Sequence, residues 1–432
     1  MAKKRRKTKR QLREERRKKM RKRKRIILLT IEIIILAALL VAAYGIFKLG
    51  KLDYNVLNKK NLEVYKDTGE YTNIALFGLD SRNNELDGGV QSDCIMIASI
   101  NNKTSDVKLV SVYRDTLLQQ KNGRYNKANS AYNTGGPEEA ISLLNRNFDL
   151  DIKNYVSVNF NALVKVIDAL GGIDIKMTKE EAHWCNLYGA ETARVIGEHW
   201  SDIKEKAGTQ HLDGIHGVAY ARIRYTSGND FKRAQRQRIV LEKVAKKAQK
   251  ANFITLNKIV NEVFPMISTS FSSKQILGFA ANALNYNLVS TNGFPYQVTT
   301  SETVKNHSGV SFVIPIGLEQ NVKQLHQELF NDDSYEASDK VKEIDSDIVY
   351  LTDITADNTE AMESTFKGDS LNEGTEENYF RIWNLYAELF CQLHSVTGKM
   401  VLCFGNYSDC GSCLFVCSLG KGKWKLCGTC YN

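Results

Sequence analysis

Histidine is scarce in this sequence, and cysteine is nearly absent until the last 42 residues. The seven histidines are scattered over 432 residues, so the sequence offers no histidine metal site. Only Cys94 and Cys185 precede residue 391. Cys94 lies within an apolar run, where a thiol behaves as a small core side chain. The chemistry of the main part of the chain is therefore sought among its carboxylates and arginines.

Acidic residues are almost missing from the N-terminus. Residues 1–25 hold 17 of the 59 lysines and arginines but only Glu14 and Glu15, so this tail carries +15. The formal net charge of the whole chain is +10, which leaves −5 for the remainder. A basic tail is typical of nucleic-acid binding or of a signal for membrane topology. No reading element such as a helix-turn-helix accompanies it, so nucleic acid is not expected as a partner.

A long apolar run follows this tail directly. Residues 26–47 are almost all aliphatic, and as a helix these 22 residues would span ~33 Å, enough for the hydrocarbon core of a bilayer. A run this long and uniform is rarely a core helix. It lacks a small-residue cleavage site, so we expect a retained anchor rather than a cleaved signal peptide. Because lysine and arginine favour the cytoplasm, the sequence predicts a single-pass cell-membrane protein whose C-terminal part is extracellular.

Apolar runs and helical patterns alternate beyond a polar stalk at 48–70. The runs at 94–100 and 107–112 are separated by a polar turn, which predicts a β-hairpin. Other strands are predicted at 73–79, 155–160, 172–177 and 220–224, helices at 137–148, 161–170, 232–250, 256–268 and 273–287, and a last strand and helix within 296–325. This mixture predicts an α/β fold, a mixed central sheet covered by helices.

Charged residues follow two of the predicted strands. They are Asp80, Ser81 and Arg82 after the first strand, and Arg114 and Asp115 after the third. Loops at strand ends are held by a rigid sheet, and binding sites are usually built there. Mg²⁺ requires one or two carboxylates plus substrate phosphate oxygens, which Asp80 and Asp93 would supply. Surface ion pairs would explain either cluster equally well.

A third cluster of cationic side chains lies between residues 220 and 238. Arg222 and Arg224 would share one face of the strand predicted at 220–224. On the following helix, one stripe at 3.6-residue spacing carries two polar residues and then core-like ones: Arg233, Gln237, Val240, Val244 and Ala248, with Arg236 at its flank. An inward arginine requires an anion, and a helix N-terminus favours phosphate. A pyrophosphate-sized ligand is predicted; a buried arginine–aspartate network is the alternative.

The sequence resembles the LytR–CpsA–Psr family of bacterial cell-wall enzymes. The matching stretches follow one another in family order after the expected anchor: GLDSR (78–82), SDCIMIASINNKTSDVKLVSVYRDT (92–116), NKANSAYNTGGPEEAI (126–141), YVSVNFNALVKVIDALGGIDI (155–175) and HLDGIHGVAYARIRYTSGNDFKRAQRQR (211–238). The resemblance covers a catalytic domain at 71–250, with residues 251–330 as a further helical and strand part of the same domain.

The resemblance implies a fold and an activity. The family fold is an α/β/α sandwich with an apolar tunnel for a polyprenyl chain. Its members transfer a phosphoglycan, such as teichoic acid or capsule, from a polyprenyl-pyrophosphate carrier to peptidoglycan, assisted by Mg²⁺ or Mn²⁺. Binding of the lipid-linked glycan without catalysis, hydrolysis of its pyrophosphate, and a transcriptional attenuator are the alternatives.

The resemblance also implies roles for individual residues. Asp80 and Asp93 would bind the metal, and Arg114 and Asp115 would act in catalysis, Asp115 as a base or an orienting group. The pyrophosphate ligands would be Arg82, Arg114, Lys127, Arg222, Arg224, Arg233 and Gln237. Such a set suits phosphoryl transfer, which needs positioning and charge neutralisation more than covalent chemistry. The sequence departs from the family at Tyr113, where proline is usual, at Leu118 and at 215–217.

The C-terminal part lies outside the resemblance. Residues 331–378 contain fifteen Asp or Glu against three Lys, a composition that predicts a disordered linker. Residues 379–432 form a cysteine-rich tail in which two CxxC motifs, at 410–413 and 427–430, are separated by thirteen residues. This spacing is typical of a zinc ribbon, but thiols outside the cell tend to oxidise. Disulfides, zinc and an aberrant extension are the three alternatives.

Overall fold

The computed structural model describes residue 47, residues 49–79, 86, 89–224 and 229–362, and three short segments at 400–403, 414–420 and 423–429. The chain divides into two compact units, Met1–Gly368 and Asp369–Asn432. The predicted tail at 1–25 and membrane span at 26–47 lie outside the described residues, apart from Phe47. Among the residues that are described, no helix has the length and apolar composition needed to cross a bilayer.

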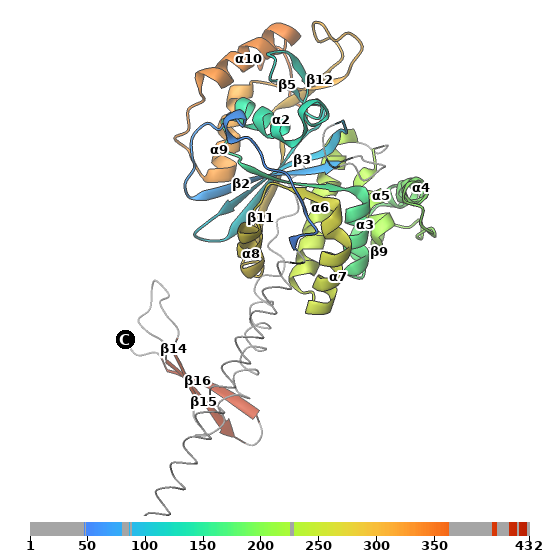
Figure 1. Cartoon of the computed structure of the whole chain (residues 1–432), viewed down its shortest axis with the longest axis vertical. Coiled ribbons are helices and arrows are strands. Elements are labelled where there is room, and N and C mark those ends of the chain that lie inside the picture. The colour runs from blue at the N-terminus through green and yellow to red at the C-terminus, as the bar shows by residue number, and fades with distance from the viewer. Residues whose placement is uncertain are drawn as a thin grey trace, which may run out of the picture. The chain divides into compact units, whose positions relative to one another are not determined.

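A seven-stranded mixed sheet forms the centre of the first unit (Figure 1). Its order is β1 (Asp53–Tyr54), β10 (Ile267–Thr269), β7 (Asn154–Asn159), β2 (Tyr71–Leu79), β3 (Ser92–Asn101), β4 (Asp106–Val112) and β11 (Asn287–Phe294). β2, β3 and β4 are antiparallel neighbours, whereas β2 pairs with β7 and β4 with β11 in parallel. The predicted mixed sheet and the β3–β4 hairpin are confirmed.

Helices and short hairpins surround this sheet. The helices are α2 (Ser130–Phe148), α3 (Phe160–Ala169), α4 (Lys179–Ile196), α5 (Gly214–Arg222), α6 (Asn229–Gln249), α7 (Phe253–Val263), α8 (Ser273–Ala281), α9 (Leu318–Phe330) and α10 (Asp339–Thr352). The hairpins pair β5 (Leu117–Gln119) with β6 (Tyr125–Lys127), β8 (Ile173–Met177) with β9 (Gly208–Leu212), and β12 (Val298–Ser301) with β13 (Phe312–Pro315).

Both faces of the sheet are covered because side chains alternate along its strands. On β2, Ala75 and Phe77 join the large apolar core beneath α2, α9 and α10. The intervening Ile74 and Leu76 face the opposite side, where they pack in a second cluster with α6 and α8. Figure 1 shows α2, α9 and α10 on one side of the sheet and α6 and α8 on the other.

The strand predicted at 220–224 is wrong. Residues 214–222 form α5, whose first turn is capped by Asp213: its side chain accepts a hydrogen bond from the His216 amide. Ile223 then leaves the helix with an extended backbone. Five alternating residues match a strand, but here the last turn of a helix produces the same pattern.

The stalk predicted at 48–70 is part of the folded domain. Leu49, Leu52 and Leu62 are buried. β1 pairs with β10, and the Asn58 amide donates a hydrogen bond of 2.9 Å to a Glu138 carboxylate on α2. Polar side chains of this segment contact the domain as well: Glu63 pairs with Arg146 at 2.6 Å, and Asn61 donates a hydrogen bond of 2.7 Å to Glu138.

The linker predicted at 331–378 is also wrong where the structure describes it. α10 turns Val341, Ile344 and Ile348 into the main core, and Tyr335 donates a hydrogen bond of 2.6 Å to Asp149. Asp339 and Glu343 lie on the outer face, whereas Asp345 and Asp347 accept hydrogen bonds from the Leu318 amide and the Tyr125 hydroxyl. Composition therefore concealed an amphipathic helix. Residues 363–378 of that predicted linker lie outside the described part.

The second unit contains an antiparallel three-stranded sheet. Its strands are β14 (Met400–Cys403), β15 (Leu414–Gly420) and β16 (Lys423–Thr429), in that order. Cys410, Cys413 and Cys430 of the two CxxC motifs lie outside the described residues. The disulfide, zinc and aberrant-extension alternatives for residues 379–432 remain predictions.

Candidate active site

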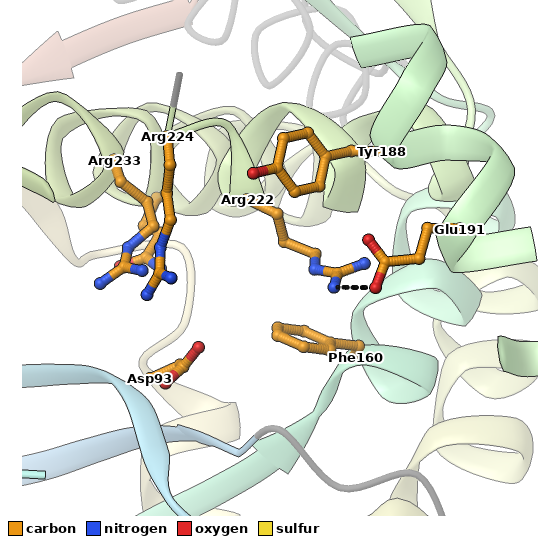
Figure 2. A pocket seen from close by; sticks show the side chains of 8 residues that line it. Asp93, Phe160, Tyr188, Glu191, Arg222, Arg224 and Arg233 are labelled. Atoms are coloured by element: carbon orange, nitrogen blue, oxygen red, sulfur yellow. Dashed lines mark hydrogen bonds and ion pairs between the residues drawn. The ribbon is translucent and has the colours of Figure 1, made fainter. Parts of the chain in front are cut away.

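A polar pocket opens where the start of β3, the end of β7, and helices α4, α5 and α6 meet. It encloses about 210 Å³ and is lined by Asp93, Phe160, Tyr188, Glu191, Arg222, Arg224, Arg233 and Gln237 (Figure 2). Three arginines therefore face two carboxylates across a small space. Because Asp93 also pairs with Arg114, positive charge is in excess, and the pocket suits an anion.

Arg222 at the end of α5 is held from four directions. Its Nη1 donates a hydrogen bond of 2.9 Å to Thr192 Oγ1, and its Nη2 one of 3.3 Å to Glu191 Oε1. The guanidinium lies 5.2 Å from the Phe160 ring centroid and 5.6 Å from that of Tyr188. Figure 2 shows it between the two rings. Such contacts fix the plane of the guanidinium, which a bidentate phosphate contact requires.

Arg224 and Arg233 lie side by side on the other side of the pocket. Figure 2 shows both guanidinium groups pointing toward Asp93. Arg233 follows the start of α6, only 5% exposed. The N–H groups and partial positive charge of a helix N-terminus add to the cationic character of this side.

Arg236 does not reach the pocket. Its Nε donates a hydrogen bond of 2.9 Å to Glu181 on α4, and its Nη1 one of 3.1 Å to the Ile223 carbonyl. It therefore secures the turn between α5 and α6. The inward stripe on α6 is confirmed by Val240 and Val244, which are buried further along the helix.

Alternating charges run from the pocket edge to the β5–β6 hairpin. Arg114 Nη1 lies 2.6 Å from Asp93 Oδ1, and Arg114 Nε lies 3.6 Å from Asp115 Oδ2. Lys127 Nζ is 3.1 Å from Asp115 Oδ1. Arg114, which lies outside the 220–238 cluster, thus forms an arginine–aspartate network, while Arg222, Arg224 and Arg233 of that cluster line the pocket.

The LytR_cpsA_psr family model matches residues 46–330. The chain belongs to the LytR–CpsA–Psr family. The polyisoprenyl-teichoic acid–peptidoglycan teichoic acid transferase TagU of Bacillus cereus is 26% identical over 234 residues, which cover 53% of this chain and 69% of that protein. The protein of the same name from Halalkalibacterium halodurans is 32% identical over 187 residues, 43% and 55% of the two chains.

Solved structures share the fold of this family member. TagT bound to LIIa-WTA matches 65% of this chain and 100% of its own, with a TM-score of 0.51 and 20% identity. The protein gbs0355 from Streptococcus agalactiae matches 63% and 94%, with a TM-score of 0.51 and 24% identity. The expected α/β fold with its mixed sheet agrees with these structures.

Tyr113, where the family usually has proline, fills a specific space in this LytR–CpsA–Psr protein. Its ring packs edge-on against Phe231 at the start of α6, with centroids 4.7 Å apart. A Cβ on Gly293 would lie 2.1 Å from the Tyr113 hydroxyl, so β11 requires glycine there. Tyr113 thereby joins the end of β4 to α6 and supports the two elements that carry Arg114 and Arg233.

Cys94, predicted as a core residue, is only partly buried on β3 and belongs to none of the apolar clusters of the described residues. Burial raises the pKa of its thiol to about 12, so the side chain stays neutral beside Asp93. A Cβ added to Gly78 on β2 would lie only 2.8 Å from the Cβ of Cys94, which explains the glycine of the GLDSR stretch.

The predicted metal ligands are only partly described. Asp80 and Arg82 lie outside the described residues. Within the part that the structure describes, no group of three or more His, Cys, Asp or Glu side chains could hold a metal ion. Asp93 offers one carboxylate. A Mg²⁺ ion that takes its remaining ligands from phosphate and water fits such a site, whereas one that needs a full protein cage does not.

The aromatic and carboxylate partners of Arg222 were missed by the sequence analysis. Tyr188, Glu191 and Thr192 all lie on α4, which was not predicted. A signal was present: Thr178 and Glu181 form a capping box at the start of this helix, and Gly197 ends it in the left-handed conformation. Phe160 was predicted, but as the end of a strand.

Proposed function

We propose that this protein transfers a teichoic acid or similar phosphoglycan from a polyprenyl-pyrophosphate carrier to peptidoglycan. The observation that carries the proposal is the convergence of Arg222, Arg224 and Arg233 on one small pocket beside Asp93. Planar guanidinium groups suit the oxygens of a pyrophosphate. The transferase names of the TagU relatives support the same reaction.

The residues of the pocket would act by position and charge. An acceptor hydroxyl attacks the phosphorus that bears the glycan, a new P–O bond to the acceptor forms, and the P–O bond to polyprenyl phosphate breaks. The proton of the hydroxyl passes to a base or to water. The three arginines and Gln237 hold the pyrophosphate oxygens and stabilise the charge that develops on them. Asp115, between Arg114 and Lys127, orients these two cations toward the reacting phosphate.

Mg²⁺ or Mn²⁺ is the proposed cofactor, held by Asp93 together with Asp80. When bound, it would neutralise charge on the pyrophosphate oxygens. Asp93 contributes the oxygen donor that such hard cations prefer, and Arg114 keeps this carboxylate in place.

The second apolar cluster is the proposed binding region for the polyprenyl chain. Leu76, Val156, Leu241, Ile276 and Phe279 are only partly buried there, although they lie between the sheet and helices α6 and α8. Covering these apolar side chains with a hydrocarbon chain would lower the free energy, because it removes their remaining apolar surface from water. The carrier cannot leave the bilayer, which suits a single-pass protein anchored by residues 26–47 with its domain outside the cell.

The test uses the full-length chain in lipid vesicles with a labelled polyprenyl-pyrophosphate-linked teichoic acid precursor and peptidoglycan. We expect release of polyprenyl phosphate together with label on peptidoglycan, both lost with chelator and in Arg233→Ala. Arg124→Ala, an exposed arginine in the β5–β6 turn, is the matched control and should retain activity.

The two products separate the alternatives. Release of polyprenyl phosphate without label on peptidoglycan would indicate hydrolysis of the pyrophosphate. Binding of the precursor without either product would leave a carrier-binding protein and overturn the transferase proposal.

A further inference from the structure

α8 exposes an apolar stripe to solvent. Throughout Ser273–Ala281, all of which the structure describes, no side chain is buried. Ile276 and Phe279 pack partly against the core. Leu277, Ala280 and Ala281 are exposed at the spacing of one helix face, and Leu284 is exposed in the turn that follows α8; Leu277 is 51% and Leu284 73% exposed.

α7 adds apolar side chains at the same end of the domain. Ile254 is 79% exposed, and Leu256 is exposed as well. Gln249, at the end of α6 and shortly before α7, donates hydrogen bonds to the carbonyls of Ala283 (3.3 Å) and Tyr286 (2.8 Å). The start of α7 and the turn after α8 therefore lie on either side of the end of α6. Figure 1 shows α7 and α8 at the end of the domain opposite α10.

The charges around this surface have one dominant sign. From Val263 to Ser301 the sequence contains no Asp or Glu, and Lys274 is its single charged residue. Lysines border the surface at the end of α6 and on α7: Lys246, Lys247, Lys250 and Lys258. Acids also lie at its edges: Glu242, which pairs with Lys246 at 2.7 Å, Glu262, Asp53 on β1, Asp106 opposite Asn287, and Asp174 near Lys247. An apolar centre with a lysine border matches an anionic lipid surface.

Two residues that follow the predicted anchor at 26–47 contact α7 and α8. Lys51 Nζ donates a hydrogen bond of 3.2 Å to Asn261 on α7, and the Tyr54 hydroxyl lies 3.2 Å from Ser273 Oγ at the start of α8. β1 pairs with β10, which directly precedes α8. The chain that leaves the domain toward the predicted anchor thus starts between α7 and α8.

We propose that the α7–α8 surface, formed by Ile254, Leu277 and Leu284, rests on the outer leaflet of the membrane. The leucine and isoleucine side chains enter the interfacial region, and the bordering lysines contact anionic headgroups. The surface would fix the orientation of the domain on the bilayer. This inference concerns a contact with lipid and does not require that the protein transfers glycan.

The test places a reporter on the surface of the full-length chain. Leu284→Trp and, as matched control, Tyr350→Trp are each reconstituted into phosphatidylcholine–phosphatidylglycerol vesicles with brominated acyl chains. Tyr350 is also exposed but lies on α10. We expect the added fluorescence of Leu284→Trp to be lost by bromine quenching and that of Tyr350→Trp to be retained. Adding Leu277→Asp and Ile254→Asp to Leu284→Trp should restore the fluorescence.

Two results would overturn the proposal. Equal fluorescence of Leu284→Trp in brominated and ordinary vesicles would show that the surface does not meet lipid. Protection of this tryptophan from aqueous iodide without bromine quenching would show that a protein, such as a second copy of the chain, covers it. Neither result depends on turnover, so failure here and failure of the proposed transferase function are distinguishable.

Discussion

Arg114 Nη1 donates a hydrogen bond of 2.6 Å to Asp93 Oδ1, which joins the end of β4 to the start of β3 at the pocket edge. The two side chains are only 16% and 19% exposed. A largely desolvated pair of this kind is costly to break from one side, because the other charge is left without its partner. Experiments that substitute these residues must therefore measure transfer activity and thermal stability separately.

Asp93→Asn separates the two effects. The asparagine keeps an oxygen for Arg114 but removes the negative charge, so we expect transfer to fall roughly 10²–10³-fold with little change in thermal midpoint. Arg114→Ala should lower both transfer and the midpoint, since Asp93 and Asp115 then lose a cation. Transfer assays and thermal unfolding on the same preparations check this. Unchanged transfer by folded Asp93→Asn would remove that residue from the site.

Thr192 is expected to position Arg222 for the pyrophosphate. Thr192→Val removes the 2.9 Å hydrogen bond, and a loss of about 1 kcal/mol in carrier binding corresponds to a KM raised roughly fivefold, with kcat little changed. Thr192→Ser keeps the hydroxyl and should restore the wild-type KM. A KM that rises equally in both variants would show that the hydroxyl has no part in binding.

α10 should contribute to the stability of the whole first unit. Ile344 is fully buried in the main core, so Ile344→Ala is expected to lower the free energy of unfolding by about 2–5 kcal/mol. Lys342→Ala, two residues earlier on the exposed face, should change it by less than about 0.5 kcal/mol. Denaturant unfolding measures both. Equal stability of the two variants would show that residues 331–362 do not stabilise the domain and act as a linker.

His326 should make the protein less stable in mild acid. Burial lowers the pKa of this side chain, whose Nε2 donates a hydrogen bond of 2.9 Å to the Phe148 carbonyl and whose ring stacks on Tyr335. The folded state therefore binds the proton more weakly than the unfolded chain. This contribution is complete above about pH 6.5 and declines as the pH falls toward the lowered pKa.

The comparison that isolates this effect is His326→Gln, which cannot titrate. Between pH 7 and pH 5, thermal unfolding of the wild type should lose more stability than that of the variant. Parallel curves for the two proteins would assign the acid sensitivity to other groups.

The sequence predicted the elements whose pattern is local. β2, β3 and β4 are continuous apolar runs, and the charged residues at their ends had to lie at one edge of the sheet. Arg222 and Arg224 line the predicted pocket, although the strand predicted for them is the end of a helix and the turn after it. Motif residues locate a site without determining the local backbone conformation. The ring partners of Arg222 depend on how α3 and α4 pack against α5, and no local pattern expresses that packing.

Average composition gave the wrong prediction for elements that have one apolar face and many charged residues. In α10, four acidic residues are interspersed among the apolar ones, and Val341, Ile344 and Ile348 share one face. The same holds for the first residues of the domain, where a few leucines are buried among polar neighbours. Spacing, rather than average charge, carries the information in both segments.

The pairing of β1 with β10 places residues 53 and 54 in the sheet, shortly after the proposed anchor at 26–47. With residues 53 and 54 in the sheet and an anchor at 26–47, the pocket would stand at a set height above the bilayer. A protein anchored in this way would not swing outward to sample distant layers of the wall. It would choose acceptors by their depth and meet new ones by diffusing sideways in the membrane, so that the innermost wall strands become the ones that are modified.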